Sequence, residues 1–122
     1  MAHLVVDGEK VRLHLSILEI LGAFHRSPEV DISEVESIEI EETPWVREVL
    51  KGVRAPGTGI PFVIMLGTMR YRGGKDFVAI YRRKPAAVIN FRSGEFKRWI
   101  FEIKDMAEIE ALRDVLKQKS SD

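Results

Sequence analysis

Residues 54–92 read RAPGTGIPFVIMLGTMRYRGGKDFVAIYRRKPAAVINFR, and this stretch decides the fold of the chain. It holds three apolar runs separated by polar turns. The glycines of Arg72-Gly73-Gly74-Lys75 tolerate the positive φ that hairpins require. With a fourth apolar run that follows Ser93-Gly94, the pattern predicts an antiparallel meander. Its strands are expected at Phe62–Thr68, Phe77–Arg82, Ala86–Arg92 and Glu95–Ile103.

The residues before this stretch mix strand and helix signals. Val11, Leu13 and Leu15 alternate with polar residues and predict a strand. The run Ile17–Phe24 fits either a second strand or a short helix, and its periodicity does not decide. One helical turn at Ile32 is expected to lead into a strand through Ile38 and Ile40. The further expectations are a capped helix over Thr43–Gly52 and a loop over Arg54–Pro61, which carries two glycines and two prolines.

The C-terminal part of the chain predicts one amphipathic helix. Asp105 fits the N-cap position, and Glu108 three residues later completes a capping box. Ile109, Leu112 and Val115 form the apolar stripe of this helix. The polar residues 118–122 are expected to fray. Several central strands are apolar on both faces, which indicates a strongly bent, covered sheet or a sheet buried in a subunit contact.

The composition excludes several classes of function but does not identify one. The 122 residues fit one domain, 1–122, and their 19 basic and 19 acidic side chains give no bulk attraction to nucleic acid. The absence of cysteine excludes disulfides, thiolate metal sites and cysteine nucleophiles. No apolar run reaches the ~20 residues of a transmembrane helix, and the start lacks a basic leader with a long apolar stretch. We therefore expect a cytoplasmic protein without a transmembrane segment.

A group of basic residues forms the candidate binding site. If neighbouring strands bring the turn ends together, their side chains can hold a phosphate or a carboxylate. The alternative is a solvated turn that protects a strand edge. The residues of this candidate site are Arg70, Arg72, Lys75, Arg82, Arg83 and Lys84.

The remaining polar residues indicate no catalytic or metal site. Seven acids between Glu29 and Glu42 form a block without a base, which fits a solvated face or a partner contact. The three histidines, His3, His14 and His25, lack metal-ligand spacing, and no serine lies in a nucleophile-elbow motif. We expect no catalytic residue, no metal and no cofactor.

Turn and core positions of the chain resemble a family. The segments Arg54–Pro61, Gly67-Thr68, Arg72–Phe77 and Phe101–Leu112 are similar to those of small uncharacterised bacterial proteins with a pleckstrin-homology (PH)-like domain. The resemblance covers about residues 10 to 117. It implies an α+β, mainly β fold, a partly open antiparallel β-barrel of about seven strands capped by one C-terminal α-helix. It also implies a docking role for proteins, peptides or lipid head groups.

These observations favour a non-enzymatic docking module that binds a protein partner through the basic hairpin surface. Anionic lipid head groups are the second candidate ligand, bound through a weaker contact. Two alternatives stay open. One is a homo-oligomeric structural protein, suggested by two-sided apolar strands and by segregated acidic and basic halves. The other is a small enzyme or ligand carrier that uses a barrel cavity, for example one lined by Arg54, Tyr71 or Tyr81.

Overall fold

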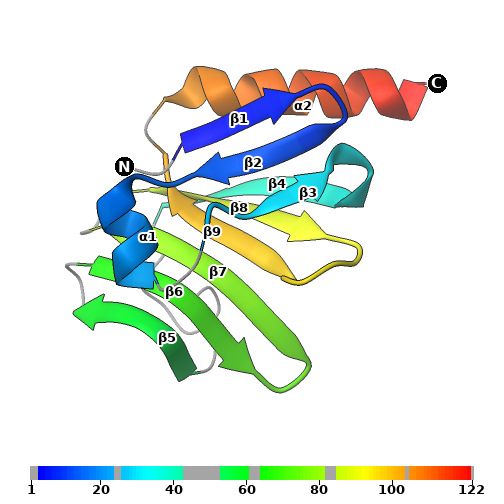
Figure 1. Ribbon diagram of the computed structural model, residues 1–122. Coiled ribbons are helices and arrows are strands. Elements are labelled where there is room, and N and C mark those ends of the chain that lie inside the picture. Colours follow the sequence, from blue (N-terminus) through cyan, green and yellow to red (C-terminus); the bar gives the residue numbers. More distant parts are fainter. Residues whose placement is uncertain are drawn as a thin grey trace.

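The computed structural model describes residues 3–23, 26–42, 53–60, 64–81, 85–103 and 105–121. Its strands form two sheets (Figure 1). The small sheet has the order β1-β2-β3 and consists of β1 (His3–Asp7), β2 (Lys10–His14) and β3 (Glu29–Asp31). The large sheet has the order β4-β8-β9-β7-β6-β5. Its strands are β4 (Val35–Glu41), β5 (Val53–Ile60), β6 (Ile64–Tyr71), β7 (Gly74–Tyr81), β8 (Ala86–Phe91) and β9 (Arg98–Glu102).

Strand β9 lies in the middle of the large sheet, so the predicted meander is wrong in its strand order. β9 is antiparallel to β8, with Val88 opposite Ile100, and parallel to β7, with Val78 opposite the same Ile100. A meander would pair each strand with its neighbour in sequence. Here the apolar residues on both faces of β7 and β8 let β9 insert between them, where both of its own edges are paired.

The expected loop over Arg54–Pro61 is also wrong, because Val53–Ile60 forms the edge strand β5. β5 pairs with β6, and the register shifts between Arg54 and Gly57. Pro56 falls inside that irregularity, where its missing N–H removes no ladder hydrogen bond. Prolines usually indicate loops, so the proline of this bulged edge strand contributed to the wrong prediction. The helix expected over Thr43–Gly52 lies outside the described residues.

Local hydrogen bonds explain the two α-helices in the described part of the chain, α1 (Ile17–Ala23) and α2 (Met106–Ser121). The ambiguous run after Leu15 is helical because Ser16 and Glu19 form a capping box. The Glu19 N–H donates to Ser16 Oγ (3.2 Å), and the Ser16 N–H donates to Glu19 Oε1 (2.9 Å). In α2 the predicted cap is confirmed, since Asp105 Oδ1 accepts the N–H of Ala107 at 2.9 Å. α2 continues to Ser121, beyond the predicted start of the polar tail.

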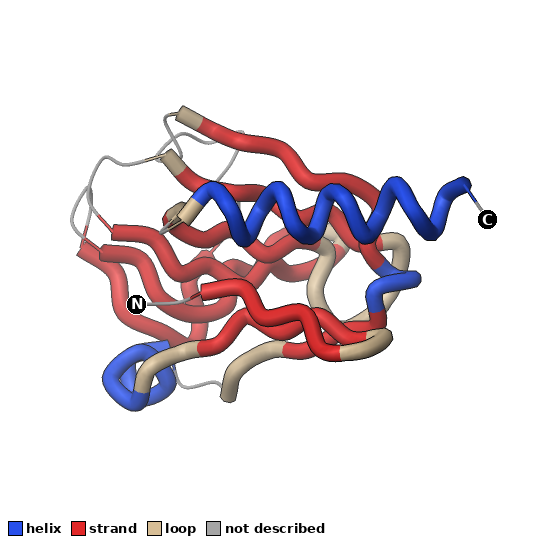
Figure 2. Tube along the Cα trace, turned by 90° about the horizontal axis from the view of Figure 1, so that it is seen from above, coloured by secondary structure: helices blue, strands red, loops and turns tan. Residues whose placement is uncertain are grey.

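Both faces of the large sheet are buried, which confirms the two-sided apolar pattern. On one face Phe77 and Trp99, both 0% exposed, pack in a core that includes Val11 and Leu13 of the small sheet and Leu112 of α2. Figure 2 shows α2 running alongside the strands of the small sheet. The other face of the sheet carries a second cluster of buried apolar side chains, formed by Met69, Val78, Ile80, Ala86, Val88 and Ile100.

The prediction of a mainly β, α+β fold with one C-terminal helix is confirmed. The expected helical turn and strand are present as the 3₁₀ turn η1 (Ile32–Glu34) and β4. The described strands lie in two sheets and do not close into a single barrel. The β6–β7 turn lies at the bottom of Figure 1, and the opposite end of β7 lies beside α1.

Candidate functional site

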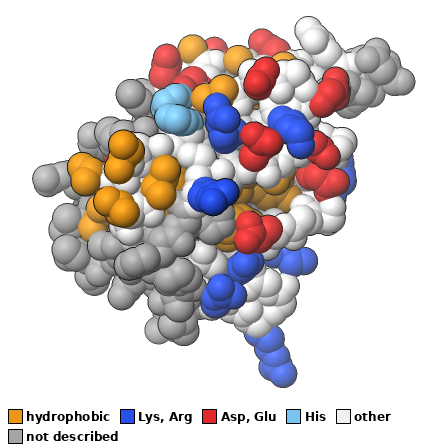
Figure 3. Space-filling model, in the orientation of Figure 1, with side chains coloured by type: hydrophobic (Ala, Val, Ile, Leu, Met, Phe, Trp, Pro, Cys, Tyr) orange, Lys and Arg blue, Asp and Glu red, His pale blue; other side chains and the backbone are white. Residues whose placement is uncertain are grey.

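Three residues of the predicted basic site lie together at the β6–β7 hairpin. Arg70 and Lys75 are direct cross-strand partners, and Arg72 lies in the turn itself. Arg70 and Arg72 are exposed and Lys75 is half-buried. Gly73 makes this tight turn possible, because its φ of 105° is accessible to glycine and costly for other residues. Figure 3 shows Lys and Arg side chains gathered at the lower end of the molecule, over this hairpin.

The other three predicted residues, Arg82, Arg83 and Lys84, lie outside the described residues. Tyr81 precedes them and ends β7. Six residue steps of strand separate Tyr81 from Lys75, which corresponds to roughly 20 Å. The predicted basic residues that the structure describes all lie at the β6–β7 hairpin end of the sheet.

The turn between β8 and β9 adds a cation that the predicted site did not include. The Lys97 N–H donates to the Lys75 carbonyl oxygen at 2.8 Å, which attaches this turn to the hairpin. The Lys97 side chain crosses Gly74 so closely that a Cβ on Gly74 would lie 2.6 Å from Lys97 Cγ. The sequence around Lys97 does not predict this contact, because the contact depends on the insertion of β9 beside β7. We call the four cations Arg70, Arg72, Lys75 and Lys97 the basic tip.

An acidic and an aromatic side chain position Lys75 within the basic tip. Lys75 Nζ lies 3.4 Å from Glu95 Oε2 and 5.2 Å from the centroid of the Phe96 ring. Phe96 itself is buried and packs edge-on against Phe77 (5.5 Å between centroids). The core therefore supports the charged surface from below. Glu95 offsets part of the positive charge of the basic tip.

A buried ion pair holds the strands beneath the basic tip. Arg98 donates from Nε (3.0 Å) and Nη2 (2.6 Å) to Asp76 Oδ2, and Asp76 is 0% exposed. The Tyr71 hydroxyl donates to Asp76 Oδ1 at 2.8 Å. Burial, together with the hydrogen bond and the negative charge of Asp76, raises the pKa of Tyr71 to about 12. The phenol thus remains a protonated donor at physiological pH.

Polar residues continue across the sheet as a row. Arg98 lies opposite Asn90 on β8, and Asn90 lies opposite Ser37 on β4. Asn90 Nδ2 donates to Ser37 Oγ at 3.0 Å and makes a longer contact of 3.4 Å with Glu39 Oε1. These bonds link β8 to β4, as the Asp76–Arg98 ion pair links β7 to β9.

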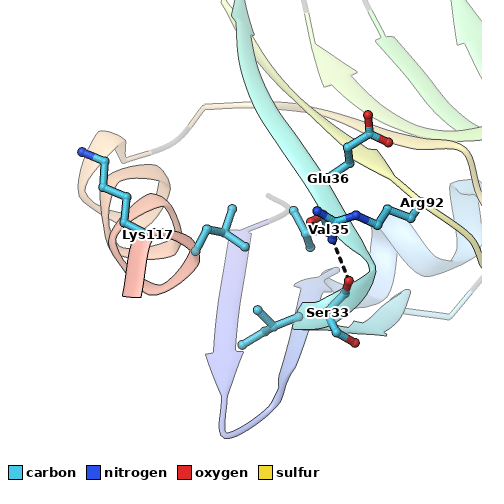
Figure 4. Close-up of a pocket in the computed structure, with 7 residues that line it drawn as sticks. Ser33, Val35, Glu36, Arg92 and Lys117 are labelled. Atoms are coloured by element: carbon cyan, nitrogen blue, oxygen red, sulfur yellow. Dashed lines mark hydrogen bonds between the residues drawn. The ribbon is translucent and has the colours of Figure 1, made fainter. Parts of the chain in front are cut away.

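Two grooves lie elsewhere on the described part of the chain. The larger, of about 440 Å³, runs between β4 and the end of α2 and is lined by Ile32, Ser33, Val35, Glu36, Arg92, Leu116 and Lys117 (Figure 4). Arg92 Nη1 donates to the carbonyl oxygens of Ser33 (2.9 Å) and Val35 (3.0 Å), and Lys117 points away from it. A second groove, of about 290 Å³, lies between β3 and the β8–β9 turn. Neither of these two is lined by Tyr71 or Tyr81.

Several members of the acidic block make contacts within the molecule. Lys10 Nζ lies 3.2 Å from Asp31 Oδ1 and 3.8 Å from Glu29 Oε1, and the Ser93 hydroxyl bonds to Glu34. Within the described ranges, no group of three or more His, Asp or Glu side chains is placed to hold a metal ion. None of the helices described for this chain combines the length and the apolar character required to cross a bilayer.

Comparisons with protein-family models, with curated proteins and with solved structures gave no match to this chain.

Proposed function

We propose that this protein is a non-enzymatic docking module, a variant of the PH-like architecture, whose basic tip binds an acidic segment of a partner protein. The observation that carries the proposal is the rigid convergence of Arg70, Arg72, Lys75 and Lys97 at one end of the large sheet. The cations come from two turns that are far apart in sequence. A charge cluster that served solubility alone would not need this support.

Rigidity matters because binding costs less entropy when the contacting groups are already positioned. The Asp76–Arg98 ion pair and the Tyr71 hydroxyl fix the strands from which the tip projects. Charge complementarity then accelerates encounter with an acidic partner and selects against basic ones. Guanidinium groups such as Arg72 add two-pronged hydrogen bonding to carboxylates.

The test uses a fluorescently labelled peptide of glutamates and glycines as the probe, followed by anisotropy at low and high salt. We expect wild-type protein to bind and the double variant Arg72→Glu/Lys97→Glu to bind at least tenfold more weakly, with salt weakening only the wild type. Lys117→Glu is the control for a charge reversal away from the basic tip, on α2, and the single variant Arg72→Glu is the tip variant matched to it in charge. A tip variant that binds as tightly as wild type would refute the proposal.

Anionic vesicles form a separate arm of the same experiment. If the basic tip recognises lipid head groups and no acidic peptide, the wild-type protein does not bind the peptide. The variant Arg72→Glu/Lys97→Glu then loses the vesicle binding that the wild type shows. That result would replace the protein ligand with a lipid one. The control variant Lys117→Glu must remain unchanged in both arms for either conclusion.

A further inference from the structure

Helix α1 has its polarity reversed with respect to the usual surface helix. Ile17, Leu18 and Leu21 are 77%, 80% and 64% exposed, whereas its one acid, Glu19, is 3% exposed. An amphipathic helix on a protein surface normally turns its aliphatic side chains to the core and its charges to water. Exposed aliphatic residues that adjoin one another on a single helix mark an interaction site more often than isolated ones do.

The reversed orientation is held by hydrogen bonds. Glu19 Oε1 caps the start of the helix at Ser16, and Glu19 Oε2 accepts a hydrogen bond of 2.5 Å from the Tyr81 hydroxyl on β7. Ala23, at the other end of α1, is 0% exposed in the core. Rolling the helix to bury Leu18 would break these contacts and expose a buried carboxylate. The aliphatic side chains are therefore presented on a fixed support.

The size and composition of this patch decide between its possible occupants. Three aliphatic side chains offer only a few hundred Å². A stable interface between two copies of the chain, or with another protein, needs roughly 800 Å² from each partner and is usually anchored by aromatic or arginine side chains. Figure 3 shows hydrophobic side chains gathered on the left of the molecule, over α1. A patch this small fits a soft apolar phase better than a protein surface.

A cation adjoins the aliphatic residues. The Leu15 N–H donates to Ser27 Oγ at 2.9 Å, which brings the exposed Arg26 close to the start of α1. Because Glu19 is buried, α1 presents no acid to repel an anionic surface. Aliphatic residues with a basic residue beside them are the combination that binds anionic bilayers.

We propose that α1 docks this protein on an anionic lipid bilayer, with Ile17, Leu18 and Leu21 entering the boundary between head groups and acyl chains. The contact is shallow and reversible and recognises no particular head group. It goes beyond the docking role of the basic tip, because α1 contacts the Tyr81 end of β7 and the tip lies at the other end. The protein could then hold an acidic partner near a membrane surface.

Vesicle co-sedimentation tests the proposal. The probes are vesicles of phosphatidylcholine alone and vesicles in which a third of the lipid is phosphatidylserine. We expect wild-type protein to sediment with the anionic vesicles, and the double variant Leu18→Gln/Leu21→Gln to partition at least tenfold less. Glutamine preserves helix propensity, so the fold should survive. Met106→Gln is the matched control, because Met106 is an exposed apolar residue (41%) on α2.

Three results would overturn the proposal: no sedimentation of the wild type with anionic vesicles, equal binding by Leu18→Gln/Leu21→Gln, or an equal loss in Met106→Gln. Analytical ultracentrifugation without lipid gives a fourth result that would overturn it. If the wild type is a dimer and Leu18→Gln/Leu21→Gln is a monomer, the patch is a contact between two copies of the chain. The basic-tip variant Arg72→Glu/Lys97→Glu separates this proposal from the proposed function. It should keep most vesicle binding while losing peptide binding.

Discussion

Arg98 and Asp76 are direct partners in the parallel pairing of β9 with β7, and they form a buried salt bridge there. Both donated bonds end on one carboxylate oxygen, Asp76 Oδ2, while Tyr71 donates to the other. The Arg98 side chain is 13% exposed and Asp76 is 0% exposed. The carboxylate is thus removed from water and depends on its partners in the protein.

Replacing Arg98 by methionine should destabilise the protein by about 3 kcal/mol, because it leaves the Asp76 carboxylate buried and unpaired by a cation. Urea denaturation followed by tryptophan fluorescence measures this. The double variant Asp76→Asn/Arg98→Met should lose less than the sum of the single variants, since neither charge remains. Strictly additive losses would show that the two residues are not coupled.

The exposed pair of Lys10 with Asp31 provides the comparison. Both side chains are more than half exposed, at 57% and 56%, so water screens their interaction. We expect Lys10→Met to change the free energy of unfolding by less than about 0.5 kcal/mol. A loss as large as that of Arg98→Met would contradict the ranking of the two ion pairs by burial.

Alkaline pH should destabilise the fold through its tyrosines, Tyr71 and Tyr81. Burial, followed by hydrogen bonding to a carboxylate, raises the pKa of Tyr71 from 10.0 to about 12, and the pKa of Tyr81 also rises from burial and from Glu19. Above pH 10 the unfolded chain loses phenolic protons that the native state keeps. Stability from these groups is therefore full below pH 10 and is lost as pH rises through their native pKa values.

Ultraviolet titration of tyrosinate measures this directly. In native Tyr81→Phe protein the single remaining phenol should titrate near pH 12, and after denaturation in urea near pH 10. A native midpoint near 10 would show that the Tyr71 hydroxyl does not bond to Asp76 in solution.

The capping box of α1 should contribute measurably to stability. Ser16→Ala removes the oxygen that accepts the Glu19 N–H and should cost about 1 kcal/mol. Glu19→Ala should cost more, about 2 kcal/mol, because it also removes the acceptor of the Tyr81 hydroxyl. Thermal unfolding by circular dichroism compares the two. If both variants lose the same amount, the Tyr81 contact adds nothing.

Neighbouring glycines in the β6–β7 hairpin should respond differently to alanine. Gly73 has open space around it but a φ of 105°, so Gly73→Ala should cost about 1–2 kcal/mol from backbone strain. Gly74→Ala meets only the flexible side chain of Lys97, which can move aside. We expect its cost to stay within about 0.5 kcal/mol, measured by urea denaturation, with a displaced Lys97 visible by NMR. Equal costs would contradict this distinction.

Much of the secondary structure was predictable because it is determined by residues that are close together in the sequence. The strands around Phe77 and Val88, the hairpin at Gly73 and the Asp105 cap all follow from residues within a few positions. The loop prediction at Arg54–Pro61 failed because an edge strand tolerates Pro56 in a bulge. The meander failed because pairing partners are chosen by packing across the whole sheet, which no local window contains.

The candidate site was predictable only in part, for the same reason. Arg70, Arg72 and Lys75 share one hairpin, and their proximity follows from the turn. Lys97 reaches the hairpin only because β9 pairs with β7, so its role depends on tertiary structure. The reversed polarity of α1 was equally hidden, since its sequence contains Ser16 and Glu19 at capping distance but does not show which side faces the core.

The central position of β9 has a consequence for synthesis on the ribosome. Its residues, Arg98–Glu102, are translated after every other strand of the sheet, yet they join β8 to β7. Until they emerge from the exit tunnel, the two halves of the large sheet have unpaired inner edges, which are the sites where nascent chains associate wrongly. A chaperone that binds extended apolar segments would therefore act on this protein until β9 has been inserted between β8 and β7.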